Sequence, residues 1–111
     1  MESILTSIKK LLGIAEEYTQ FDTDISMHIN SVLSDMRQFA VGPDENFFIE
    51  DKTVTWQHFL EEKYVHAVKT YVYLRVKLLF DPPSNSSVLE SYNRQIKEWE
   101  WRLNVAAESE S

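Results

Sequence analysis

The fold is decided by residues 64–103, which read YVHAVKTYVYLRVKLLFDPPSNSSVLESYNRQIKEWEWRL. Two consecutive prolines, Pro82 and Pro83, interrupt this otherwise helix-forming stretch. Proline ends a helix because it lacks the backbone N–H and its ring clashes with the preceding turn, and it pushes the residue before it out of the helical region. The stretch therefore predicts a helical hairpin with arms at residues 64–80 and 87–106, on which the rest of the chain packs.

The first arm is apolar on two neighbouring faces. One stripe consists of Val65, Val68, Val72, Val76 and Leu79, and the other of Tyr64, Tyr71, Leu74 and Leu78. A helix that is apolar over so much of its circumference is buried on two sides. We expect one face to lie on the domain core and the other to meet a second subunit. The solvent-facing side is predicted at His66, Lys69, Tyr73 and Lys77.

The second arm carries a heptad seam, in which apolar residues alternate three and four apart. The seam consists of Leu89, Tyr92, Ile96, Trp99 and Leu103, and it predicts the buried side of this helix. Ser87 and Glu90 have the spacing of a capping box, so the helix is expected to begin at Ser86 or Ser87.

An exposed tryptophan is often the anchor of an interface. Trp101 lies away from the seam, and it is expected either to contact a partner or to cover another part of its own domain. The candidate residues for a subunit or partner interface are Tyr64, Tyr71, Leu74, Leu78, Trp101 and Val105. Residues 107–111 are expected to form a loose tail.

The N-terminal part predicts two further helices. Residues 3–12 form a short amphipathic helix by their apolar spacing, with Gly13 at the position of a C-terminal glycine cap. This helix is expected to cover the domain's own core, with a partner surface as the alternative. A polar, acidic linker then leads to a helix over residues 24–39, for which Asp22 or Thr23 is the expected N-cap.

The segment 41–55 is the one region that is not plainly helical. It predicts either a loop or a small β-hairpin near residues 47–54. Its acidic side chains lack the alternating ligand positions and the turn glycine of a calcium loop, so we expect a solvated loop without metal. Thr53 or Thr55 is expected to cap a short helix over residues 56–62.

Composition favours a single all-α domain, a small helical bundle organised on the long hairpin. The chain has 111 residues, only two glycines and no cysteine. There is no phosphate-binding glycine loop, no HExxH motif and no thiol nucleophile, so we expect neither an enzyme nor a cofactor. The sequence shows no signal peptide and no apolar run long enough to span a membrane, which predicts no membrane partner.

Two blocks of the chain resemble the head–tail connector proteins of long-tailed phages and prophages, also called DNA-packaging or head-completion proteins. These blocks are residues 68–83, VKTYVYLRVKLLFDPP, and residues 96–104, IKEWEWRLN. Residues 8–14 and 21–25 also look like the opening of that family. The resemblance covers nearly the whole chain, but it rests on signatures of a helical fold rather than on a chemical fingerprint.

The resemblance implies a homo-oligomeric ring beneath the portal protein, at the head–tail junction of the virion. The ring would extend the DNA channel, dock a stopper or tail-completion protein, and be made in the bacterial host cytoplasm. It implies no catalysis, and DNA would pass without sequence-specific binding. The net charge of −7 agrees with a channel wall that does not hold phosphate.

Two alternatives from other classes stay open. One is a small helical interaction or regulatory module that dimerises through the seam of the second arm. The other is a helix-turn-helix DNA binder, which is disfavoured because the helix after the prolines carries Glu90, Glu98 and Glu100.

Overall fold

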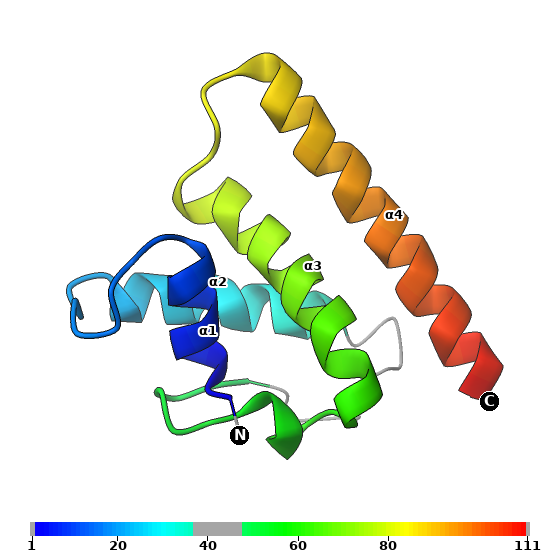
Figure 1. Ribbon diagram of the computed structural model, residues 1–111, viewed down its shortest axis with the longest axis horizontal. Coiled ribbons are helices and arrows are strands. Elements are labelled where there is room, and N and C mark those ends of the chain that lie inside the picture. The colour runs from blue at the N-terminus through cyan, green and yellow to red at the C-terminus, as the bar shows by residue number, and fades with distance from the viewer. Residues whose placement is uncertain (1, 37–47, 111) are drawn as a thin grey trace.

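The computed structural model describes residues 2–36 and 48–110 (Figure 1). Over these residues the chain forms four α-helices and no strand, which confirms the all-α class. The elements are α1 (Ile4–Leu11), α2 (Asp22–Asp35), the 3-10 helix η2 (Trp56–His58), α3 (Glu62–Phe80) and α4 (Ser86–Glu110). The predicted end of the second helix at Phe39, the start of the β-hairpin at Phe47 and the last tail residue Ser111 lie outside the described residues.

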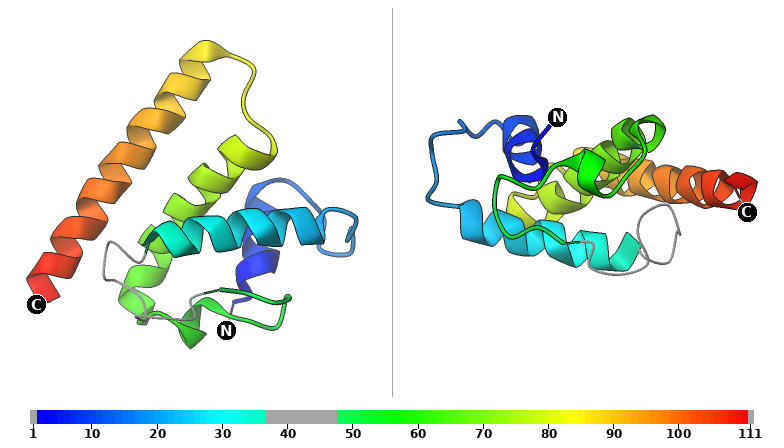
Figure 2. Two further views of the ribbon diagram at one scale, coloured as in Figure 1. Left: turned by 180° about the vertical axis from the view of Figure 1, so that it is seen from behind. Right: turned by 90° about the horizontal axis from the view of Figure 1, so that it is seen from below.

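Helix α3 is the centre of the bundle. Helix α1 lies beside it, α2 crosses behind it in the view of Figure 1, and α4 runs antiparallel along the side away from α1 (Figures 1 and 2). The core combines residues from every helix with Ile49 and Leu60. Its fully buried members include Ile4, Ile8, Ile25, Ile29, Val32, Leu33, Trp56, Val68, Tyr71, Val72 and Val76. Both apolar faces predicted for residues 64–80 are therefore largely buried within one chain, but Leu79 of the first stripe is 49% exposed.

Helix α1 has well-defined ends. The Ser3 hydroxyl accepts a hydrogen bond from the Thr6 amide at 3.1 Å, which caps the N-terminus. At the other end Gly13 adopts a positive φ of 82°, and its amide donates to the Lys10 carbonyl at 3.1 Å. Glycine takes this left-handed conformation without the Cβ clash that other residues meet, so Gly13 ends the helix as its position predicts.

A buried lysine fixes the connection from α1 to α2. The Lys9 ammonium donates to the carbonyls of Glu16 and Tyr18, at 2.9 and 2.8 Å, and pairs with Asp22 Oδ1 at 2.8 Å. Asp22 is thus engaged with Lys9 and does not cap α2, contrary to the sequence prediction. The N-cap position is held by Phe21, which makes no side-chain cap hydrogen bond.

The predicted β-hairpin near residues 47–54 is wrong for the described residues 48–54. The side-chain amide of Asn30 forms two hydrogen bonds with the backbone of Ile49. Its nitrogen donates to the Ile49 carbonyl at 2.9 Å, and its oxygen accepts from the Ile49 N–H at 2.6 Å. This clamp draws Ile49 into the core, where it is buried. The segment then pairs with the N-terminus instead of with itself, through an isolated bridge between Ser3 and Thr55.

The short helix predicted over residues 56–62 is also shorter than expected. It is the single 3-10 turn η2, because Glu61 has an extended backbone and α3 begins directly after it. The Thr55 amide donates to His58 Nδ1 at 2.9 Å, which stabilises this turn. Trp56 is fully buried, and its indole N–H donates to the Ser7 hydroxyl of α1 at 2.9 Å.

The turn between α3 and α4 lies at the two prolines, as predicted, but the capping residue and the last residue of α4 differ from the prediction. Asn85, rather than the predicted Ser87, caps α4: its side-chain oxygen accepts from the amides of Ser87 and Val88 at 2.8 and 3.2 Å. The helix continues through Glu110, so residues 107–110 are helical rather than a loose tail. In the part of the chain that the structure describes, no helix is long and apolar enough to cross a membrane.

Candidate assembly surfaces

Helix α4 is held on α3 by an apolar strip with polar contacts beside it. Ile96 and Leu103 are buried, with 8% and 1% of their surface exposed. Beside them, the Tyr71 hydroxyl donates to Glu100 at 2.8 Å, and the rings of His66 and Trp99 meet edge to face with centroids 6.2 Å apart. The C-terminal half of α4 is thereby fixed to the body of the bundle.

A chain of polar contacts runs from α2 through α3 to α4. Arg75 donates to the Tyr71 hydroxyl at 2.7 Å and to Asp35 at 2.8 Å, while Tyr71 donates to Glu100. Burial, followed by the hydrogen bond to Glu100, raises the pKa of Tyr71 to about 12. The protonated hydroxyl is therefore part of the native structure.

This network predicts a loss of stability in alkali. A tyrosine with a folded-state pKa of about 12 and an ordinary value of 10.0 contributes stability that is complete below pH 10 and is lost as the pH rises toward 12. We expect urea unfolding of Tyr71→Phe to show a flatter decline over this pH range than the wild type. The matched control is Tyr18→Phe at an exposed site. An equally steep decline in Tyr71→Phe would contradict this role.

The predicted interface residues of α3 lie inside the chain's own fold. Tyr71 and Leu74 are 0% and 4% exposed, and Tyr64 and Leu78 are partly buried against the same core. At Tyr71, the face expected to meet a second subunit contacts Glu100 of α4 in the same chain. The pattern indicated that this face is buried without indicating which segment buries it.

The residues predicted on the solvent side of α3 also make contacts within the chain. Tyr73 approaches Tyr92 of α4, with 3.4 Å between the hydroxyl oxygens. Burial and this contact raise the pKa of Tyr73 to about 12. His66 contacts Trp99, whereas Lys69 pairs with Glu2 at 2.9 Å and Lys77 with Asp81 at 2.8 Å. On this side of α3, His66 and Tyr73 therefore contact α4, whereas Lys69 binds the N-terminus and Lys77 binds the residue that ends α3.

The predicted seam is buried at two of its five positions and is most exposed next to the turn. Leu89, nearest the turn, is 36% exposed, and Tyr92 and Trp99 are partly buried. Ile96 and Leu103 are buried. The seam thus faces α3 of its own chain, which removes the sequence basis for a dimer formed through it.

The outer face of α4 carries the most exposed large apolar side chain among the residues that the structure describes. Trp101 is 67% exposed, and Val105, one turn further on, is 40% exposed. At 3.6 residues per turn, Trp101 lies roughly 140° around the helix from the buried Ile96. Arg94 and Lys97 are seven and four residues before Trp101, so they project from the same face. Of the six predicted interface residues, Trp101 and Val105 are the two on the exposed surface.

A hollow of about 470 Å³ lies beside the N-terminal half of α2. Its apolar lining includes Leu5, Ile49 and Met27, and Met27 is 65% exposed. Glu50, Asp51 and Lys52 also line it. Hydrogen bonds from the Thr53 hydroxyl and amide hold the pKa of Asp51 below its usual range, so this carboxyl is ionised at neutral pH. Sequence reasoning missed this hollow because it depends on the contact between Asn30 and Ile49.

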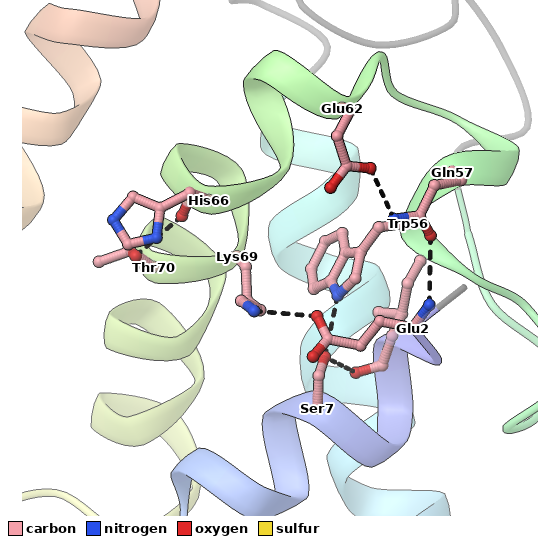
Figure 3. A network of polar contacts seen from close by, with 9 residues as sticks. Glu2, Ser7, Trp56, Gln57, Glu62, His66, Lys69 and Thr70 are labelled. Atoms are coloured by element: carbon pink, nitrogen blue, oxygen red, sulfur yellow. Dashed lines mark hydrogen bonds and ion pairs between the residues drawn. The ribbon is translucent and has the colours of Figure 1, made fainter.

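A second hollow, of about 460 Å³, lies where the N-terminus meets α3 (Figure 3). Its polar groups bind one another: Lys69 pairs with Glu2 at 2.9 Å, and Gln57 donates to Glu62 at 2.9 Å. The Glu2 amide also donates to Gln57, at 3.3 Å. These contacts hold the N-terminus on the bundle. Among the described residues, no group of three or more His, Cys, Asp or Glu side chains is placed to hold a metal ion.

The protein is thus small and all-helical, and its candidate surfaces for assembly are the outer face of α4 and the hollow beside α2. Residues 4–110 match the family model described as phage connector protein, and since this match spans nearly the whole chain, the protein belongs to that family. No curated protein and no solved structure matches it. Membership gives the chain a structural role as a connector in the virion, where it interacts with other capsid or tail proteins.

Proposed function

We propose that this connector subunit assembles into a closed ring beneath the portal of a phage or prophage capsid. The ring extends the DNA channel and provides a docking surface for the next stopper or tail-completion protein. The role is purely structural and uses no catalysis and no cofactor. It makes the protein part of head completion and DNA packaging at the head–tail junction.

Two unlike surfaces near opposite ends of the molecule support this proposal. The outer face of α4 projects Trp101, while the hollow beside α2 is concave and has Met27 at its side. Contacts between unlike surfaces are head-to-tail, and such contacts close into a ring when the rotation between neighbours permits. A symmetric dimer would instead use one surface twice.

Charge supports the channel role. The chain carries 18 acidic and 11 basic residues, for a net charge of −7. Binding to DNA phosphates requires a basic surface, so a wall of this composition lets DNA pass without strong attachment. The same balance disfavours a helix-turn-helix DNA binder.

Negative-stain electron microscopy of the purified protein, alone at high concentration and mixed with a portal protein, tests this function. We expect closed rings of one size, with the portal increasing their number or stacking on them. A dimer that never grows larger, even with the portal present, would contradict the ring and favour a dimeric interaction module.

A further inference from the structure

We propose that Trp101 of one subunit inserts into the hollow beside α2 of the next subunit. This inference rests on the proposed ring and names its repeating contact. The occupant of the hollow is thus a second copy of this chain, entering with the outer face of α4.

The projecting side of the contact is built rigidly. Trp101 sits on a helix whose opposite face is fixed by buried Ile96 and Leu103 and by the hydrogen bond from Tyr71 to Glu100. An indole held out in this way loses little conformational entropy on binding, because its backbone is already ordered. Tryptophan is also among the side chains that most often dominate interface energy.

The receiving side suits an aromatic ring. The hollow of about 470 Å³ has Leu5 and Ile49 in its lining and the thioether of Met27 beside it. Methionine sulfur makes favourable contacts with aromatic rings and adapts its shape to them. Asn30 and Ile49, which both line the hollow, are joined by two hydrogen bonds, so this part of its wall is already formed in the isolated subunit.

Charge sets the direction of the contact. Arg94 and Lys97 flank Trp101 on α4, and neither forms an ion pair within the described part of the chain. Glu50 and Asp51 line the hollow together with Lys52, so two acidic side chains stand there against one basic side chain. Pairs of this kind at the rim of an interface contribute mainly to orientation and to the rate of encounter.

The two surfaces cannot meet within one chain. The orange-to-red C-terminal half of α4 and the blue-to-cyan N-terminal half of α2 lie toward opposite ends of the long axis (Figures 1 and 2). That axis spans 40 Å, and the flat molecule is 19 Å thick. Joining the outer face of α4 to the hollow therefore links one subunit to the next and leaves each new subunit with a free copy of both surfaces.

Cysteine cross-linking tests the contact, since the chain has no cysteine of its own. Ser26 lines the hollow and Val105 lies one turn beyond Trp101. When Ser26→Cys and Val105→Cys proteins are mixed with a short bis-maleimide, we expect a covalent dimer containing one chain of each. With both substitutions in one chain, the product should be a ladder beyond the dimer. The matched control is Ser31→Cys, an exposed serine of α2 that does not line the hollow, which should give at least about tenfold less product.

A second pair of variants tests the energetics. Trp101→Ala should weaken ring assembly at least about tenfold, while its monomer unfolds like the wild type. Lys97→Glu should also weaken assembly, and adding Glu50→Lys should restore it. If the wild type forms rings and Trp101→Ala forms rings that are equally stable, the Trp101 contact is wrong while the proposed ring still holds. The inference is also overturned if Val105→Cys links to itself. If the wild type forms no rings, both the inference and the proposed function fail.

Discussion

Trp56→Ala should lower the free energy of unfolding by about 3–5 kcal/mol, the usual cost of removing a buried tryptophan. Trp56 is 0% exposed, and its indole N–H donates to the Ser7 hydroxyl at 2.9 Å. The substitution leaves a cavity between η2 and α1 and removes the partner of a buried hydroxyl. Urea unfolding followed by far-ultraviolet circular dichroism measures the change.

The chain offers a matched control for this prediction. Trp101→Ala makes the same chemical change at a residue that is 67% exposed, and it should alter monomer stability by no more than about 0.5 kcal/mol. Equal losses in the two variants would mean that Trp101 belongs to the core. Its assignment to an assembly surface would then be wrong.

Lys9→Met should destabilise the fold by about 3 kcal/mol, the lower end of the cost of breaking a buried ion pair. Only 3% of the Lys9 side chain is exposed, and its ammonium binds the carbonyls of Glu16 and Tyr18 as well as Asp22. Methionine fills a similar volume but leaves these oxygens without their donor. The loss stays at the lower end because 29% of the Asp22 side chain is exposed to water.

The neighbouring lysine controls for loss of charge. Lys10 is exposed and lies on the same helix, so Lys10→Met removes one positive charge without breaking a buried contact. We expect a change within about 0.5 kcal/mol, measured by the same urea titration. If Lys9→Met were as mild as Lys10→Met, the link between α1 and α2 would not depend on the buried ammonium.

The hairpin was predictable because its signals are local. Pro82 and Pro83 act on the residues beside them, and α3 ends at Phe80 as their chemistry requires. The glycine cap at Gly13 is local in the same way. The capping residue of α4 was misassigned because Asn85 and Ser87 are both good caps, and the choice between them depends on where the first turn begins.

The contacts that shape the candidate site were not predictable from the sequence, because they join distant residues. Asn30 and Ile49 are 19 positions apart, and their hydrogen bonds replace the expected β-hairpin. The role of Lys9 depends on a linker that folds back over it. Trp101 was correctly separated from the seam by helical spacing, yet the hollow proposed to receive it has no sequence signal of its own.

Native mass spectrometry of the wild-type protein tests ring assembly most directly. A closed ring predicts one dominant mass, a fixed multiple of the subunit well above the dimer, which persists over a range of protein concentrations above the assembly threshold. Its loss in Trp101→Ala would tie that assembly to the outer face of α4. Monomers or dimers alone at every concentration, with or without a portal protein, would contradict a ring-forming connector subunit.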